Sequence, residues 1–467
     1  MRDAAPFYAP RVGAGAGRRL DSLALSLARL LARPPRCRRP SVTATLHPHS
    51  RHAAAPDPVC LVVAGAVSLG IGMGIGRFAF TPILPMMLTD GVIALGPASW
   101  LATANYAGYL LGALLCMVAP WLDARLAWWP RPQSTQLVRG GLLATGLLTL
   151  AMALPWPGAW PALRFAAGVA SAVVFVHTSG WCLAQLAQRG AAALGGAIYT
   201  GPGAGIVVSG LLASAMVAAQ WRAATAWTLF GVLAFALAAS VWRVFRAEPQ
   251  PQPQPPAPAP NDPRQAPAVA RADAEPATGR PVEVAVLAAA YGLAGFGYII
   301  TATFLPVIAA QALPGSGLLE FFWPLFGLGV MVGALLASRL RAPRDLRRLL
   351  AASYLMQALG IGLSLWSPSA LGFAVGSLLL GLPFTAITFF ALQEVRRLRP
   401  QAAASAIGLI TALYGLGQIA GPALVAWLLR ESASPAAGFS LSLQIAAAAL
   451  VLGALLYLTM SRLYPLR

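Results

Sequence analysis

The sequence predicts an all-α polytopic membrane protein, with twelve transmembrane helices in two pseudo-symmetric six-helix halves. Composition is the first observation behind this prediction: 58% of the 467 residues are hydrophobic and only 10% are charged, whereas charged residues make up about 25% of a soluble protein. The second is that a Pro-rich segment divides the apolar runs into two sets of six. Most of the chain is therefore expected to lie in lipid.

The length of the apolar runs defines the predicted spans. A bilayer core of about 30 Å requires about 20 apolar residues in a helix. Runs of this kind, separated by charged residues or by Pro and Gly clusters, occur at 59–87, 98–120, 137–154, 162–186, 194–219, 222–245, 284–311, 320–338, 347–367, 370–394, 402–429 and 438–461.

The distribution of Arg predicts the orientation of these spans. The two termini and the alternate connections carry 28 Arg, whereas the opposite connections carry only Arg222 and Arg430. Positive charge marks the cytoplasmic side of a membrane protein, so both termini are predicted to be cytoplasmic. The net charge of +19 is explained by this asymmetry, and no nucleic-acid partner is expected.

Four segments follow from these patterns. Residues 1–57 are Arg-rich and are expected to form a basic, disordered cytoplasmic tail, or alternatively to precede the true start of the protein. Residues 58–247 form the first six-helix half. Residues 248–282 are rich in Pro and form a cytoplasmic linker that cannot bury a core. Residues 283–467 form the second half.

The two halves share a sequence repeat at one offset. In the first span, Gly74-Ile-Gly-Arg77 and a later Leu-Pro pair match Gly295-Phe-Gly-Tyr298 and its Leu-Pro pair in the seventh span, 221 residues later. In the second span, the run that begins at Gly112 matches the run that begins at Gly333 at the same shift. Two helices with one offset indicate an ancient duplication.

Four stretches of the chain resemble a known transporter family. They are GIGMGIGRFAFTP at 70–82, NYAGYLLGAL at 105–114, YGLAGFGYIITATFLP at 291–306 and TALYGLGQIAGP at 411–422. The chain resembles the YbfB/YjiJ-type branch of the major facilitator superfamily from about residue 58 to residue 465. The resemblance implies a multi-pass inner-membrane secondary transporter whose substrate is unassigned, with spans one, two, seven and eleven among those that line its cavity.

Arg77 is the clearest candidate for a substrate contact. It lies deep in the first span, where a charge is costly and is usually retained for a function. Its planar guanidinium could hold an anionic or carboxylate-bearing substrate. The structural alternative is that Arg77 ties the first span to backbone carbonyls of a neighbouring helix, or extends toward the membrane surface.

Uncharged polar residues in the cavity-lining spans are further candidates for substrate binding, because such groups suit a polar organic solute. Each could equally join two helices by a hydrogen bond. These candidates are Asn105, Tyr106 and Tyr109 in span two, Tyr298, Thr301 and Thr303 in span seven, and Tyr414 and Gln418 in span eleven.

Candidates for proton coupling are few, because acidic residues are almost absent from the spans. His177 is a candidate, since the unperturbed pKa of His lies near 6.5; the alternative is a packed core His. Glu394 is the other candidate, and lies one turn before Arg397. The alternative for Glu394 is an ion pair with Arg397 that acts as a gate or a structural bridge.

The sequence therefore predicts a secondary active transporter that moves a small organic solute, of anionic or zwitterionic character, by alternating access and with coupling to an ion gradient. The protein is expected in the bacterial inner membrane, as a monomer, without cofactor, catalytic residue or metal site. The alternatives are a sensor and an enzyme that acts on a lipid-linked substrate. Such an enzyme would require clustered Asp, Glu or His at one depth, and the sequence contains no such cluster.

Overall fold

The computed structural model describes residues 57–125, 132–246, 280–340, 345–400 and 403–465. The expected tail at 1–57 and the linker at 248–282 lie almost wholly outside these residues. Within them the chain forms twelve helical rods, several of which are made of two or three consecutive helices.

The first half contains six rods. They are α2–η1–α3 (Pro58–Leu69, Gly70–Phe78 and Phe80–Thr89), α4 (Leu95–Arg125), α5 (Ser134–Ala151), α6 (Trp160–Gln188), η2–α7 (Ala192–Tyr199 and Thr200–Ala218) and α8 (Ala223–Val241).

The second half repeats this arrangement. Its rods are α9 (Pro281–Ala312), η4–α10 (Leu319–Phe321 and Phe322–Arg339), α11 (Leu346–Trp366), α12–α13 (Ala370–Gly381 and Phe384–Leu398), α14 (Ala403–Glu431) and α15 (Pro435–Leu463).

Every predicted span corresponds to one of these rods, and their ends agree within five residues. Eleven of the rods in the described residues are long and apolar enough to cross a membrane. The twelfth, α5, is shorter and includes the polar residues Gln136 and Arg139, which lower its average hydropathy. The fold class predicted from the sequence is confirmed.

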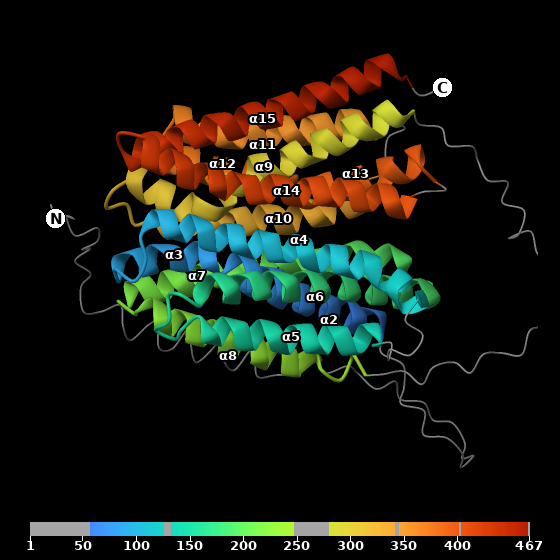
Figure 1. Ribbon diagram of the computed structural model, residues 1–467, viewed down its shortest axis with the longest axis horizontal. Coiled ribbons are helices and arrows are strands. Elements are labelled where there is room, and N and C mark those ends of the chain that lie inside the picture. Colours follow the sequence, from blue (N-terminus) through green and yellow to red (C-terminus); the bar gives the residue numbers. More distant parts are fainter. Residues whose placement is uncertain (1–56, 126–131, 247–279, 341–344, 401–402, 466–467) are drawn as a thin grey trace, which may run out of the picture.

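The two halves lie side by side along parallel rods. In Figure 1 the first half, coloured blue to green, lies below the second half, coloured yellow to red. Two pairs of helices form most of the contact between them, because α4 packs along α14 and α7 packs along α10. The end of the first rod also meets α9 through α3. Spans one, two, five, seven, eight and eleven therefore surround the interface between the halves.

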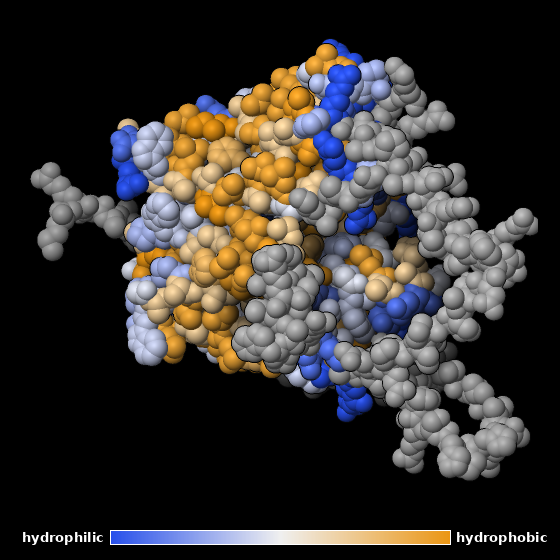
Figure 2. All heavy atoms as spheres, turned by 45° about the vertical axis from the view of Figure 1, so that its right-hand side comes forward, coloured by the Kyte–Doolittle hydropathy of each residue, from blue (hydrophilic) through white to orange (hydrophobic). Residues whose placement is uncertain are grey.

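The described Arg residues separate the two ends of the bundle. The Arg-rich end is where α9 and α11 begin and α13 and α15 finish, and includes Arg280, Arg347, Arg397 and Arg462. The Arg-poor end is where α3, α7 and α9 finish and α8 and α10 begin. An apolar surface lies between the two ends, with hydrophilic residues flanking it on both sides (Figure 2). This surface is suited to contact with lipid chains.

Candidate functional site

The middle of the first rod, η1, is a π-helix rather than an α-helix. A π-helix changes the i to i−4 hydrogen-bond pattern and leaves carbonyl groups for other donors. Side chains of α6 use these carbonyls: Arg164 donates from Nη1 to Gly76 O at 3.2 Å and from Nη2 to Arg77 O at 3.1 Å. Ser171 donates to Gly72 O at 2.6 Å. The backbone that carries Arg77 is therefore held by α6.

Glycine is required in η1 because α7 approaches its backbone closely. A Cβ added to Gly74 would lie 2.5 Å from the Cα of Gly205, and one added to Gly205 would lie 2.7 Å from the carbonyl oxygen of Gly70. Such small-residue contacts let two membrane helices pack backbone to backbone. The Gly-rich run of the first span thus positions η1 against span five.

Arg77 points into an aromatic enclosure and is only 3% exposed. Its guanidinium carbon lies 4.3 Å from the ring centre of Tyr109, 4.8 Å from that of Tyr106 and 5.3 Å from that of Phe78. These are cation–π distances. Nε and Nη2 of Arg77 have no hydrogen-bond partner, and none of the ion pairs among the described residues includes it. Two donors therefore remain available to an oxyanion.

The second half adds a stack of Tyr rings to this enclosure. Tyr298 stacks on Tyr414 with ring centres 5.9 Å apart, and Tyr414 stacks on Tyr291 at 4.5 Å. Gln418 Nε2 donates to the hydroxyl oxygen of Tyr298 at 2.5 Å, while Gln418 Oε1 is buried without a partner. Tyr298 is connected to the enclosure through Phe384, which lies 5.0 Å from Tyr298 and 6.3 Å from Phe78. Candidate residues of the first half therefore surround the guanidinium, and those of the second half pack beside this enclosure.

Two more of the predicted residues join the halves directly. Tyr106 and Thr303 share a 2.8 Å hydrogen bond between α4 and α9. Because the Thr303 hydroxyl donates to Ile299 O at 2.6 Å, Tyr106 is the donor in the bond to Thr303. Thr301 is buried, and its hydroxyl has no partner among the described residues. Tyr106 and Thr303 thus have an interhelical contact, whereas Thr301 retains an unused polar group.

Asn105 is fully buried where α4 packs against α6, and its Oδ1 has no hydrogen-bond partner among the described residues. Its Nδ2 donates to Arg164 O at 2.8 Å, and a Cβ on Gly168 would lie 2.0 Å from Asn105 O. These contacts fasten α4 to α6. The observed hydrogen bond of Asn105 joins two helices, as the structural alternative for this residue proposed. A role of Asn105 in substrate binding stays a prediction.

Arg164 is a buried charged residue outside the set of candidates predicted from the sequence. It is 2% exposed and its guanidinium also lies 4.9 Å from the ring centre of Phe80. The structural alternative for Arg77 was that it ties span one to backbone carbonyls of a neighbouring helix; in the structure Arg164 of α6 makes the reverse contact, with backbone carbonyls of span one. In the sequence, Arg164 lies near the start of span four and looks like an ordinary charged residue at a helix end. The reason for its burial is visible only in the structure, where its guanidinium donates to the carbonyl groups of the π-helix η1.

His177 lies away from the Arg77 enclosure. It is partly exposed and its Nδ1 lies 3.3 Å from Ser134 Oγ, at the first residue of α5. The structure therefore does not bring His177 together with the other candidates. Its role in proton coupling stays a prediction.

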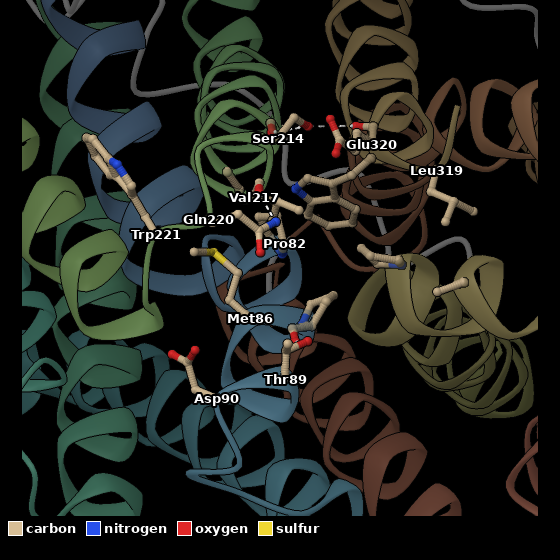
Figure 3. A pocket seen from close by; sticks show the side chains of 16 residues that line it. Pro82, Met86, Thr89, Asp90, Ser214, Val217, Gln220, Trp221, Leu319 and Glu320 are labelled. Carbon is tan, nitrogen blue, oxygen red and sulfur yellow. Dashed lines mark hydrogen bonds between the residues drawn. The ribbon is translucent and has the colours of Figure 1, made fainter. Parts of the chain in front are cut away.

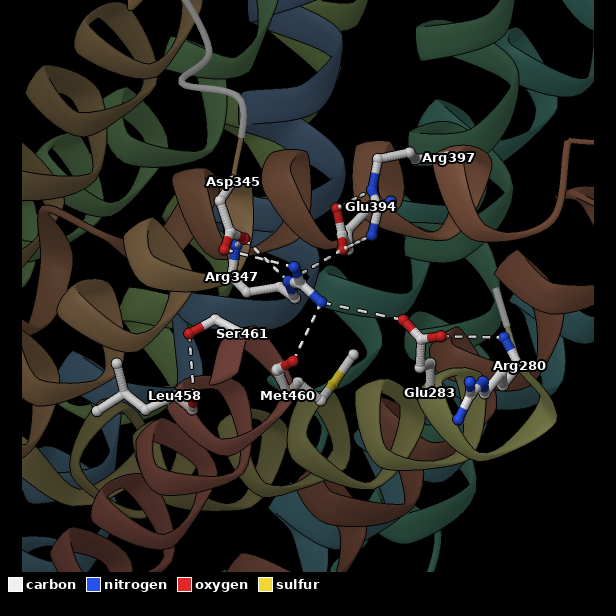
Figure 4. Close-up of polar contacts among 9 residues, drawn as sticks. All are labelled: Arg280, Glu283, Asp345, Arg347, Glu394, Arg397, Leu458, Met460 and Ser461. Carbon is white, nitrogen blue, oxygen red and sulfur yellow. Dashed lines mark hydrogen bonds and ion pairs between the residues drawn. The ribbon is translucent and has the colours of Figure 1, made fainter. Parts of the chain in front are cut away.

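Glu394 belongs to a charge network at the Arg-rich end of the second half (Figure 4). It is fully buried and pairs with Arg397 at 2.6 Å and with Arg347 at 3.7 Å. Arg347 also contacts Asp345 at 2.9 Å and Glu283 at 3.9 Å. The predicted ion pair with Arg397 is therefore present, and the network joins α9, α11 and α13.

The sequence from residue 69 to residue 458 matches the family described as "Uncharacterised MFS-type transporter YbfB". This match covers most of the chain. The protein belongs to this transporter family. It is accordingly a multi-pass membrane protein of the major facilitator superfamily, as the resemblance in the sequence implied. Comparison with curated proteins gives no significant match.

Solved structures show the same fold for this transporter. The nucleoside transporter NupG aligns with a TM-score of 0.61 at 14% identity, over 86% of this chain and 98% of NupG. A point mutant of NupG aligns with the same TM-score at 15% identity, over 86% of this chain and 99% of that chain. At this level of identity, the likeness concerns the fold alone.

Two further aromatic residues of the transporter, the buried Trp323 and the partly buried Phe384, complete the enclosure beyond the predicted set. Phe384 in α13 packs at 5.0 Å from Tyr298 and at 6.3 Å from Phe78, and Trp323 in α10 packs at 6.1 Å from Phe78. No local signal distinguishes these residues, because an aromatic side chain in an apolar run is equally compatible with a lipid-facing position. Only the packing of the halves reveals that they face inward.

Proposed function

We propose that this protein is a secondary active transporter that carries a small organic solute with a carboxylate, or a comparable oxyanion, through the interface between its two halves. In an alternating-access cycle, the halves rock about a central site and expose it to one side of the membrane at a time. The family supports transport as the general activity. The solute class rests on the environment of Arg77.

The observation that carries this proposal is the buried guanidinium of Arg77 with two unpaired donors. A buried charge normally has a partner, because an uncompensated charge in a low-dielectric region is costly. The surrounding aromatic rings offset part of this cost, yet they leave Nε and Nη2 without acceptors. A carboxylate of the solute would supply two acceptors in the planar arrangement that guanidinium favours.

Uncharged groups around Arg77 would bind the remainder of the solute. The unpaired Oε1 of Gln418 can accept a hydrogen bond from it, and the unpaired hydroxyl of Thr301 can donate or accept one. The rings of Tyr109, Tyr298 and Tyr414 offer apolar faces for stacking. These residues, together with Arg77, form the proposed binding set.

Orientation and coupling are part of the same proposal. The concentration of Arg at one end supports a bacterial inner-membrane location with both termini in the cytoplasm. Coupling to an ion gradient rests on membership of the superfamily. His177 and Glu394 remain the titratable candidates, although the ion pairs of Glu394 with Arg347 and Arg397 favour a structural or gating contribution.

Neither of the two alternatives, an enzyme that acts on a lipid-linked substrate or a sensor, has an observation that supports it. An enzyme that acts on a lipid-linked substrate needs converging titratable groups that are free to react, whereas the acids that converge on Arg347 in the described residues are held in ion pairs. The described residues also contain no group of three or more His, Cys, Asp or Glu that could hold a metal ion. A sensor could retain the same binding site without transport. Uptake of the bound solute into proteoliposomes separates a sensor from a transporter.

A ligand screen of the purified protein tests the solute class. Organic anions, zwitterions, amines and neutral nucleosides are compared by the rise in melting temperature that each produces, because a ligand that binds the native state stabilises it. Truncating one partner of a buried charge pair costs about 2–5 kcal/mol of binding. We therefore expect Arg77→Ala to lose at least about 30-fold in affinity for carboxylates, and Arg77→Lys to recover only part of it.

Arg139→Ala is the matched control for Arg77→Ala. Arg139 also makes a cation–π contact, at 4.7 Å from the Trp242 ring, and donates to Trp242 O at 2.8 Å. It lies on α5 outside the enclosure, so its removal should leave carboxylate binding unchanged. The proposal is contradicted if a folded Arg77→Ala protein responds to carboxylates as the parent does, or if only neutral compounds and amines act.

A further inference from the structure

A cavity of about 140 Å³ opens between the two halves at the Arg-poor end of the bundle. Its walls come from α3, α7, α9 and η4–α10, which are spans one, five, seven and eight. Figure 3 shows Ser214 and Glu320 together on one side of this cavity, and Thr89 and Asp90 on the other. The volume is below the usual range of about 300–1,000 Å³ for ligand pockets. In this state the cavity therefore admits a small solute or one end of a solute.

Glu320 gives this cavity a free negative charge. The hydroxyl of Ser214 donates to the backbone oxygen of Glu320 at 3.2 Å, but the Glu320 carboxylate has no hydrogen bond or ion pair with any described residue. Asp90, the second acid in the wall, has one protein partner, because its Oδ2 accepts the backbone N–H of Ala223 at 2.7 Å. Glu320 is therefore the carboxylate of the wall that has no partner among the described residues.

Trp323 is a second group in the cavity wall without a partner. Its side chain is only 1% exposed, and its indole Nε1 has no hydrogen-bond acceptor among the described residues. An indole N–H that is buried usually finds an acceptor. The wall thus presents one unpaired acceptor group at Glu320 and one unpaired donor at Trp323.

The same Trp323 separates the cavity from Arg77. Its ring stacks on Phe326 at 5.2 Å and packs against Phe78 at 6.1 Å, while Phe78 lies 5.3 Å from the Arg77 guanidinium. On a direct path from the cavity to Arg77, the pair formed by Trp323 and Phe78 therefore lies between the two. The path therefore presents a carboxylate before this pair and a guanidinium after it.

We propose that the cavity at Glu320 is the outer vestibule of the transport path, and that the two opposite charges along this path select a zwitterion with an ammonium group, a carboxylate and an apolar body. This inference rests on the proposed function, in which Arg77 binds the carboxylate. Glu320 would repel a simple organic anion and attract an ammonium group.

Matched sets of three compounds test this inference. Each set contains an amino acid, the amine that lacks its carboxylate and the acid that lacks its amino group; phenylalanine, 2-phenylethylamine and 3-phenylpropionate form one set, and leucine with its two analogues forms another. Dissociation constants are measured from melting temperatures of the full-length protein. We expect at least one amino acid to bind about tenfold more tightly than its acid, which corresponds to about 1.4 kcal/mol.

The variant Glu320→Gln shows whether Glu320 causes the preference for an amino acid over the acid that lacks the amino group. The substitution keeps the shape of the side chain and removes its charge, so the affinity for the acid should rise and that for the amino acid should fall until the two are within about threefold. Glu431→Gln is the matched control, because Glu431 is exposed at the same end of the bundle and lies outside the cavity. It should leave the parent's preference unchanged.

Three results would overturn the inference. The acid could bind the parent as tightly as the amino acid does, the preference could survive in Glu320→Gln, or no compound of any set could bind. The proposed function is judged separately, by the response of Arg77→Ala to the wider panel of organic anions. Loss of anion binding in Arg77→Ala together with an unchanged preference in Glu320→Gln would reject the vestibule and retain the proposed function.

Discussion

The hydroxyl of Thr81 donates a 3.0 Å hydrogen bond to the carbonyl oxygen of Ala302, the residue 221 positions later. This separation equals the offset of the sequence repeat, so equivalent positions of the two halves meet here. In an α-helix the Ala302 carbonyl would accept the N–H of residue 306. That residue is Pro306, which has no N–H. Thr81 of the first half therefore supplies the donor that Pro306 removes from the second.

Thr81→Val should destabilise the protein by about 1–3 kcal/mol, because it leaves a buried carbonyl without a donor. Thr81→Ser should retain most of the stability. In a Pro306→Ala background the helix regains its own N–H, so Thr81→Val should cost less there. Melting temperatures of the four proteins in this double-mutant cycle measure the coupling. Equal losses in both backgrounds would show that the hydrogen bond to Ala302 does not carry the effect.

Arg347 should be essential to the stability of the second half. It is fully buried and contacts Asp345, Glu283, Glu394 and the carbonyl oxygen of Met460, which lies 3.2 Å from its Nη1. Removing one partner from a buried ionic network leaves uncompensated charges and costs about 3–5 kcal/mol. We expect Arg347→Met to lower the melting temperature strongly.

Arg348→Met is the control for Arg347→Met, because the neighbouring Arg348 side chain is exposed at the same end. Its melting temperature should stay close to that of the parent, since exposed ion pairs contribute little. Similar losses in the two variants would mean that the buried network is not the source of stability.

Gly74→Ala should prevent the normal packing of spans one and five. The added Cβ would lie 2.5 Å from Gly205 Cα and 2.9 Å from Gly205 C, and these are backbone atoms that cannot turn aside. Gly140→Ala is a useful comparison because a Cβ at Gly140 meets no atom within 4 Å. It should stabilise α5 by up to about 1 kcal/mol, since Ala favours the helix. Folded yield and melting temperature should therefore both fall in Gly74→Ala, and the melting temperature should rise slightly in Gly140→Ala.

Arg164→Lys should weaken solute binding, although residue 164 is not expected to contact the solute itself. Lys has one compact donor head and cannot reproduce the planar fork that reaches the carbonyls of Gly76 and Arg77. We expect a lower melting temperature and a several-fold loss of carboxylate affinity, because η1 is no longer held in place. Arg222→Lys, at an exposed position, is the control. If Arg164→Lys binds carboxylates as the parent does, then Arg164 does not position Arg77.

Much of the fold is predictable because the bilayer imposes a local rule. Each span must be a continuous apolar run, so its position is encoded within its own 20 to 30 residues. Even the polar interruption of α5 is visible in its sequence. The predicted spans and the observed rods therefore agree. The division of the chain into halves follows equally from the Pro-rich segment and from the offset of 221 residues.

The candidate site is predictable only in part. Arg77 and the Tyr residues of spans two, seven and eleven are recognised because polar groups are rare at membrane depth, and the structure brings them together. Trp323 and Phe384 carry no such signal in the sequence. The same is true of Glu320, which lies close to a span end and gains meaning only from the cavity beside it.

The sequence by itself determined the class of protein, the number and order of the spans and the repeat, and it marked Arg77 as a candidate for a substrate contact. Tertiary structure alone decided that Arg164 holds the carbonyls of η1 and that Arg77 keeps two free donors. It also decided that Thr81 completes a helix in the other half. The physical reason is that hydropathy depends on neighbours in the chain, whereas the partner of a buried polar group depends on how helices far apart in the sequence pack together.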